Sequence, residues 1–124
     1  METYIFWTGG WDSTFRLLQL AEKKIKIRPI YVRDSSRKSA SVEIERMNKI
    51  LTEIKRRKAN GGGFLADIAS ICIVDKDYIM RAYPNSEISS CWKRLHKEFS
   101  LGEQYEWFAL YCSAVGCRIE CGLE

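Results

Sequence analysis

The sequence predicts an α/β protein built on a parallel sheet with helices on both faces. Short apolar runs alternate with longer segments of helical periodicity along the 124 residues. A glycine-rich turn separates the first apolar run from the first helical segment. Such alternation favours parallel strands, because each crossover helix returns the chain to the same end of the sheet. The length fits one domain of roughly 100–200 residues, so we expect a single domain over residues 1–124 with the order β-α-β-α-β-α-α-β.

The first strand is predicted at residues 4–7, a short apolar and aromatic run near the start of the chain. Residues 8–11 interrupt this run with two glycines. Asp12 or Ser13 is expected to cap the helix that follows, because a side-chain oxygen there can accept from a free backbone N–H group. The helix is expected to end near residues 23–24 and to bury a broad apolar face, formed by Phe15, Leu17, Leu18, Leu20 and Ala21.

A second strand is predicted at residues 27–32, followed by a polar loop at residues 33–39. Pro29 weakens this strand or moves its start to the residue after the proline, because proline lacks a backbone N–H group. Ser39 or Ser41 can cap the next helix, which residues 60–63 should stop. The helix is predicted from an apolar stripe at i, i+3, i+4 and i+7, namely Met47, Ile50, Leu51 and Ile54.

The remaining elements are a third strand, two helices and the start of a fourth strand. The third strand is predicted at residues 69–74 and is followed by a turn at residues 84–86. An S-x-x-E capping box, Ser100 to Glu103, should begin the second helix, and the fourth strand should begin within residues 118–121. Of these last two helices, the earlier one carries Ile88, Trp92, Leu95 and Phe99 on one face. The later one carries Tyr105, Phe108, Ala109 and Cys112 before Gly116 ends it.

Composition and charge exclude several classes of protein. Hydrophobic residues make up 46% and charged residues 29% of the chain, which excludes a disordered chain. No apolar run approaches the roughly 20 residues of a membrane span, and the N-terminus lacks a secretory signal, so we expect a cytoplasmic protein with no membrane partner. The net charge is +4, but residues 16–58 carry 14 basic and 5 acidic residues, a local +9. This region either faces nucleotide or RNA phosphates or consists of solvated helix faces.

The five cysteines predict free thiols in a reducing compartment. Their number is odd, and the chain has one histidine, His96. The spacings of five and four between Cys112, Cys117 and Cys121 differ from the C-x-x-C pattern of zinc sites. We therefore expect mostly buried, unpaired cysteines, with metal–thiolate chemistry as the alternative.

The turn after the first strand, Thr8-Gly9-Gly10-Trp11-Asp12-Ser13-Thr14, predicts an anion site. Its glycines let the backbone turn tightly and approach a ligand, and the helix N-terminus beyond it offers free N–H groups and a positive dipole end. Hydroxyl groups within the turn add hydrogen-bond donors for phosphate. A carboxylate at residue 12 favours a bridging Mg²⁺ or a bracing role. The alternative is an ordinary strand-to-helix turn.

This turn matches neither G-x-x-x-x-G-K-[ST] nor G-x-G-x-x-G. It resembles the S-G-G-x-D-S loop of the PP-loop ATP pyrophosphatases, with Thr8 in place of serine. Residues 102–107 are similar to a G-x-Q-Y-E-W segment in members of this group that resemble 7-cyano-7-deazaguanine synthase, a queuosine biosynthesis enzyme. The alternative for that segment is a capped amphipathic helix whose residues merely pack.

The resemblance implies a nucleotide alpha-hydrolase-like (HUP-like), Rossmann-like fold that binds ATP with Mg²⁺. It places the phosphates on the loop and the adenine near Trp7 and residues 31–33. Asp12 and Ser13 would be the catalytic residues, with Asp12 holding Mg²⁺. Arg33 and Arg37 would contact phosphate or substrate, or else lie in a solvated loop. The full set of implied ATP-binding residues is Trp7, Thr8, Gly9, Gly10, Trp11, Asp12, Ser13, Thr14, Tyr31, Val32, Arg33 and Arg37.

The family's activity would be adenylation of a small-molecule carboxylate or carbonyl oxygen, with pyrophosphate released and AMP later displaced by nitrogen or sulfur, as in a ligase. Family enzymes commonly exceed 200 residues, and Leu123-Glu124 resembles a cloning scar, so we expect a partial version of the fold, the N-terminal part of a longer enzyme. An incomplete sheet would expose an edge and favour a homodimer. The alternatives are a non-catalytic nucleotide-binding module and an RNA-associated module that binds tRNA through residues 16–58.

Overall fold

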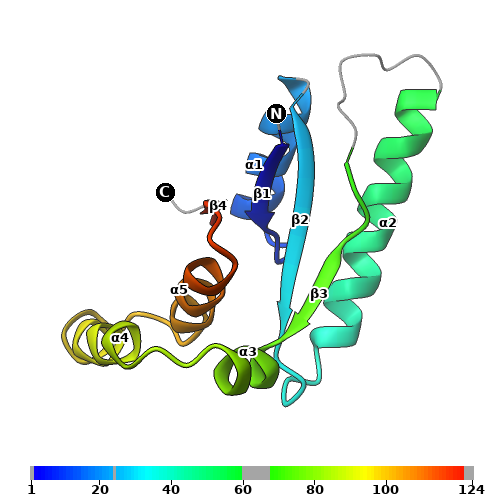
Figure 1. The fold of residues 1–124 in the computed structure, drawn as a ribbon. Helices are drawn as coiled ribbons and strands as arrows, with labels where there is room; N and C mark the ends of the chain where they lie inside the picture. Colours follow the sequence, from blue (N-terminus) through cyan, green and yellow to red (C-terminus); the bar gives the residue numbers. More distant parts are fainter. Residues whose placement is uncertain (1, 24, 60–67, 122–124) are drawn as a thin grey trace.

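The computed structural model describes residues 2–23, 25–59 and 68–121, and these residues form a four-stranded parallel sheet (Figure 1). The strand order is β3-β2-β1-β4, so the chain runs outward from β1 in one direction and later returns to the opposite side of β1. Tyr4 pairs with Arg28 on one side and with Ile119 on the other. The predicted parallel sheet is confirmed, and its arrangement with helices is Rossmann-like.

The elements follow the predicted alternation with one addition. In chain order they are β1 (Glu2–Phe6), α1 (Trp11–Glu22), β2 (Lys26–Arg33), α2 (Ala40–Ala59), β3 (Cys72–Asp75), α3 (Lys76–Ala82), α4 (Ser86–Phe99), α5 (Gln104–Val115) and β4 (Ile119–Glu120). The short helix α3 was not predicted, because its seven residues are too few to display a clear helical period. Among the described residues, no helix combines the length and the apolar character that crossing a bilayer requires.

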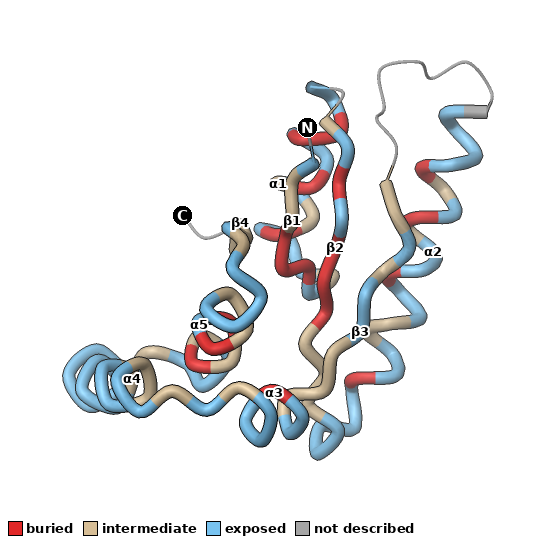
Figure 2. The backbone as a smooth tube through the Cα atoms, viewed as in Figure 1, coloured by how far each residue is buried: buried red, intermediate tan, exposed pale blue. Residues whose placement is uncertain are grey.

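Helices cover both faces of the sheet, as predicted. On one face, side chains from β1 and β2 pack with α1 and α2 in a cluster that includes Ile5, Trp7, Leu17, Ile27 and Met47. On the other face, α5 covers a second cluster made by Phe6, Ile30 and Phe108. Figure 2 shows the buried segments concentrated along β1 and β2 and on the helix faces toward them. Burial of apolar surface on both faces explains why these two strands read as near-continuous apolar runs.

One expectation for the helices is wrong in part. The apolar face of α1 is narrower than predicted, since Leu17, Leu20 and Ala21 are buried whereas Phe15 and Leu18 are exposed. Helix α4 forms where its apolar stripe predicts it, but the helix buries none of its residues and lies at the outer edge of the molecule (Figures 1 and 2). A helical stripe predicts the helix and does not by itself show what covers it.

The predicted helix starts need correction. Gly10 occupies the N-cap position of α1, so Asp12 and Ser13 lie inside its first turn and neither caps it. Ser100 has a φ of 55° and ends α4 in the left-handed conformation, while Glu103 makes no capping bond to α5, so the predicted capping box does not form. Gly116, with a φ of 67°, ends α5 as predicted. The predicted stop at residues 60–63 lies outside the described residues.

The second and third strands also differ from prediction. Strand β2 begins at Lys26 and runs through Pro29, which pairs opposite Ile5. The proline is tolerated because the residues around it carry the ladder, with Trp7 N donating to the Ile30 carbonyl at 2.9 Å. Strand β3 begins at Cys72 rather than residue 69, and Asp75 belongs to it. As described, β3 and β4 are the edges of the sheet, and dimerisation through an edge stays a prediction.

All five cysteines are free, which confirms that part of the prediction. Their burial is only partly as expected, because Cys72 and Cys91 are exposed and the other three are half-buried. Burial raises the pKa of the Cys112 thiol to about 11 and also raises that of Cys121. These two thiols pack against the aromatic cluster under α5, where they act as small apolar side chains.

Candidate functional site

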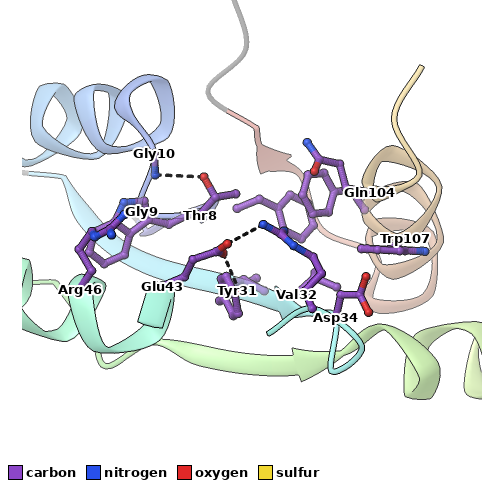
Figure 3. Close-up of a pocket in the computed structure, with 15 residues that line it drawn as sticks. Thr8, Gly9, Gly10, Tyr31, Val32, Asp34, Glu43, Arg46, Gln104 and Trp107 are labelled. Atoms are coloured by element: carbon purple, nitrogen blue, oxygen red, sulfur yellow. Dashed lines mark hydrogen bonds and ion pairs between the residues drawn. The ribbon is translucent and has the colours of Figure 1, made fainter. Parts of the chain in front are cut away.

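A cavity of about 330 Å³ opens where β1 and β2 end (Figure 3). Its walls come from the loop after β1, the loop after β2, the first turns of α2, and the start of α5. Parallel α/β sheets bind ligands at this carboxyl edge, and the volume lies at the small end of the roughly 300–1,000 Å³ range of ligand pockets. The lining residues are Phe6, Trp7, Thr8, Gly9, Gly10, Ile30, Tyr31, Val32, Asp34, Arg37, Glu43, Arg46, Gln104, Trp107 and Phe108.

Hydrogen bonds within the loop after β1 fix its shape. The Thr8 backbone N–H donates to the buried Ser13 hydroxyl at 3.2 Å, and the Thr8 and Ser13 hydroxyl oxygens lie 3.1 Å apart. The Gly10 N–H in turn donates to the Thr8 hydroxyl at 3.2 Å. Ser13 therefore braces the loop from the first turn of α1 and does not line the cavity. The backbone of residues 8–10 faces the cavity instead.

Trp7 and Thr14 form the second brace of the same loop. The fully buried Trp7 donates from Nε1 to the Thr14 hydroxyl at 2.8 Å, which ties the end of β1 to α1. Trp7 also lines the cavity, whereas the Thr14 hydroxyl is engaged in this bond and Thr14 does not line it. Both hydroxyl groups that α1 contributes to the motif thus hold the loop in place.

Gly9 is the residue that seats the loop against α2. Its φ of 78° lies in the left-handed region, which side chains other than glycine rarely adopt. A Cβ atom at this position would lie 2.9 Å from Met47 Cγ and 3.9 Å from the Glu43 carbonyl oxygen. Gly9 therefore allows the left-handed backbone of the loop and also its close approach to α2 at Met47.

Glu43 is the centre of a hydrogen-bond network on the floor of the cavity. Its carboxylate accepts from the Tyr31 hydroxyl at 2.8 Å and from the Arg37 guanidinium at 2.7 Å (Figure 3). Burial, and next the bond to Glu43, raise the pKa of Tyr31 well above its usual value, so Tyr31 stays protonated as a donor. Sequence reasoning did not select Glu43. Glu43 lies one helical turn before Met47, on the same helix face as the apolar stripe. A charged residue on that face was the one feature of the sequence that could have indicated it.

Helix α5 and the loop after β2 complete the far wall. Gln104 and Trp107 come from the first turn of α5, and Phe108 stacks on Phe6 with ring centroids 4.0 Å apart. Lys76 lies 4.9 Å over the Trp107 ring and 3.5 Å from the Asp34 carboxylate. The segment at residues 102–107 and the glycine loop, widely separated in sequence, therefore meet at one cavity (Figure 3).

The structure separates the predicted site residues into two groups. Trp7, Thr8, Gly9, Gly10, Tyr31, Val32 and Arg37 line the cavity. Trp11 is 92% exposed, Asp12 is exposed, and Arg33 pairs with Asp75 at 2.6 Å in a different hollow. Among the lining residues, sequence reasoning selected neither Asp34, Glu43 nor Arg46 as site residues. Asp34, in a polar loop, and Arg46, on a basic helix, carry no distinguishing sequence pattern.

Within the described residues, no group of three or more His, Cys, Asp and Glu side chains lies close enough together to hold a metal ion. Mg²⁺ is commonly bound by one or two carboxylates together with substrate phosphates and water. The described residues therefore offer no protein-only metal site, and Asp12, in the first turn of α1, is a carboxylate beside the loop that would hold a phosphate-bridged Mg²⁺.

Many of the basic side chains within residues 16–58 form ion pairs with carboxylates. Glu53 binds both Arg56 and Arg57, which lowers the pKa of that carboxyl to about 2. Further pairs include Arg16–Glu120, Lys26–Glu2, Arg28–Glu2, Arg33–Asp75, Arg37–Glu43 and Lys49–Glu45. This pairing favours the solvated-face interpretation of the basic region over a continuous RNA-binding stripe, and tRNA binding stays a prediction.

Comparisons with protein-family models, with curated proteins and with solved structures find no match for this chain.

Proposed function

We propose that this chain is an ATP-binding domain of the PP-loop ATP pyrophosphatase type, with a nucleotide alpha-hydrolase-like fold. The observation that carries the proposal is the meeting of two sequence segments at one cavity. Residues 8–10 and residues 102–107 each resemble a segment of this family. Residues 8–10 line the cavity at the carboxyl ends of β1 and β2, and the second segment contributes Gln104 and Trp107 to the same lining. Packing alone does not require two such segments to converge on a solvent-filled space.

The loop end of the cavity suits phosphate. Helix α1 begins at Trp11 with no side-chain cap, so the N–H groups of its first turn are available to an anion, and the helix dipole favours negative charge there. Internal bonds from Ser13 and Thr14 hold the loop in a preformed shape, which lowers the ordering cost of binding. The nucleoside then extends from the loop across Tyr31 and Val32 toward α5.

The proposed reaction is adenylation. A carboxylate or carbonyl oxygen of a small substrate attacks the α-phosphorus of ATP, the bond from that phosphorus to the bridging oxygen breaks, and pyrophosphate leaves with the electron pair. A nitrogen or sulfur nucleophile then displaces AMP. Mg²⁺ neutralises phosphate charge in such reactions, and Asp12 is the residue we assign to hold it. The chain itself positions the nucleotide and stabilises charge, which requires no side-chain nucleophile.

The test is pyrophosphate release from ATP and Mg²⁺ in the presence of a panel of carboxylic acids. Asp12→Ala should abolish release, and Gly10→Ala should do the same by placing a methyl group at the loop. Asp77→Ala is the matched control, because Asp77 is also an exposed carboxylate in the first turn of a helix, α3. A folded wild-type chain that binds no ATP in the presence of Mg²⁺ would refute the proposal.

A second candidate is a non-catalytic nucleotide-binding module of the same fold. The volume of about 330 Å³ favours it, because such a space holds one ligand and leaves little room for a second substrate beside the nucleotide. This candidate predicts saturable binding of ATP or AMP with no release of pyrophosphate under any condition. The same assay separates the two, since turnover with any carboxylic acid excludes the non-catalytic module.

A further inference from the structure

Four charged residues line the cavity, and three of them are already engaged. Asp34 accepts from the Ser36 hydroxyl at 2.6 Å and lies 3.5 Å from Lys76 Nζ. Arg37 and Glu43 form an ion pair at 2.7 Å. Arg46 is the fourth, and it has no hydrogen-bond or ion-pair partner within residues 2–23, 25–59 and 68–121. The cavity thus carries one uncompensated positive charge from the part of the chain that the structure describes.

Arg46 stands on the turn of α2 against which the glycine loop is seated. A Cβ atom at Gly9 would lie 2.9 Å from Met47 Cγ and 3.9 Å from the Glu43 carbonyl oxygen, so this turn of the helix abuts the loop. Met47 is fully buried, whereas its neighbour Arg46 is exposed and lines the cavity beside Gly9 (Figure 3). Arg46 also lines the apolar groove between α1 and α2, so it borders both the cavity and that groove.

The chemistry of this position suits a terminal phosphate. A guanidinium group keeps its charge at any physiological pH and presents paired N–H donors that match two phosphate oxygens. The free N–H groups at the start of α1 attract the phosphate chain to the same loop. A monophosphate held at the nucleoside side of the loop would not extend as far as Arg46, whereas a longer phosphate chain would approach it.

We propose that Arg46 binds the terminal phosphates of the nucleotide and makes the cavity select nucleoside triphosphates over monophosphates. This inference rests on the proposed nucleotide-binding function. In the competing interpretation, Arg46 is a solvated side chain on an exposed helix face, and its substitution changes the affinity for none of the ligands.

The test measures binding of ATP, AMP and inorganic pyrophosphate by isothermal titration calorimetry. Arg46→Gln should weaken ATP and pyrophosphate binding by about tenfold or more, as expected for loss of a charge-assisted hydrogen bond, and should leave AMP within about twofold. Arg46→Lys, which keeps the charge and loses the paired geometry, should give an intermediate loss. Lys49→Gln is the matched control, because Lys49 is a cation on the same helix that pairs with Glu45 and does not line the cavity.

The outcomes distinguish the two proposals. Equal affinity of wild type and Arg46→Gln for ATP, or equal weakening of ATP and AMP, overturns the role of Arg46 and leaves the nucleotide site intact. Binding of pyrophosphate but neither nucleotide, with a loss in Arg46→Gln, supports a phosphate-binding arginine and refutes the ATP-binding function. A folded wild-type chain that binds none of the three ligands overturns both.

Discussion

The Trp7 indole N–H donates to the Thr14 hydroxyl at 2.8 Å, so the last residue before the glycine loop is tied to the first turns of the helix after it. Trp7 packs in the core between the sheet, α1 and α2, while its neighbour Thr8 faces the cavity. One hydrogen bond therefore couples core packing to the shape of the candidate site. Loss of the bond should affect stability and ligand binding together.

Thr14→Val tests this coupling with almost no change in side-chain size. It leaves the buried Trp7 N–H without a partner, which costs about 1–3 kcal/mol in the free energy of unfolding, and it should weaken ATP binding by loosening the loop. Thr52→Val is the control, since the Thr52 hydroxyl is exposed and donates only to the Asn48 carbonyl on its own helix. Urea denaturation should show a change of no more than about 0.5 kcal/mol for the control.

Gly9→Ala should destabilise the chain more than Gly116→Ala. Both glycines have positive φ, so both alanine variants bear the strain of the left-handed conformation, about 1–2 kcal/mol. Only at Gly9 does the new Cβ meet the buried Met47, which adds an overpacking cost of about 1–3 kcal/mol. Thermal unfolding monitored by circular dichroism measures both. Equal melting temperatures would show that the loop does not press on α2.

Acid should weaken the attachment of β4 through Glu120. Arg16 donates to the Glu120 carboxylate at 2.7 and 3.0 Å, and these bonds hold the pKa of that carboxyl below its usual value. Because the folded-state pKa is lowered, the stabilisation is present above the unfolded value near 4.5 and is lost as the pH falls through the folded value. The pair is only partly buried, so its contribution is about 0.5–1 kcal/mol.

The measurement is the free energy of unfolding in urea at pH 7 and at pH 3, for wild type and Glu120→Gln. The glutamine variant should be less stable at pH 7 and should lose less stability on acidification. If both proteins lose the same amount of stability between the two pH values, the ion pair does not anchor β4.

Thiol reactivity should follow burial. The exposed Cys72 and Cys91 should react with iodoacetamide at pH 8 well before Cys112, because burial raises the Cys112 pKa to about 11 and leaves little thiolate at that pH. Mass spectrometry of digested samples taken over time gives the order. In urea all five cysteines should react at similar rates, and early labelling of Cys112 in the folded protein would contradict the packing under α5.

The sheet and its flanking helices could be predicted because the spacing of apolar residues and the positions of turn residues agree along most of the chain. Residues 4–7, and residues 27–32 apart from Arg28, are apolar, as expected for strands covered on both faces. The helix caps were harder to predict than the strands and helices. Ser13 and Ser100 are residue types that often cap helices, but Ser13 bonds Thr8 and Ser100 ends α4 in the left-handed conformation. The Ser13 hydroxyl bonds Thr8, five residues away, instead of capping the helix, because such nearby bonds compete with capping.

The candidate site was predictable only where it lies on the glycine loop and at the end of β2. Trp7 to Gly10 and Tyr31 are placed by strand ends, which a sequence pattern locates well. Glu43 and Arg46 enter the cavity because α2 crosses behind the loop, a relationship between elements that no local spacing encodes. Asp12 shows the converse, because the motif selects it and the structure leaves it exposed at the start of α1.

The central claim is that residues 8–10 and residues 104–107 form one nucleotide site. Titration of the isotope-labelled chain with ATP and Mg²⁺, followed by NMR chemical shifts, tests it most directly. We predict that the Gly9 and Gly10 amide signals and the Gln104 and Trp107 side-chain N–H signals move together and saturate with a single Kd. Absence of shifts, or shifts confined to the groove between α1 and α2, would contradict the account.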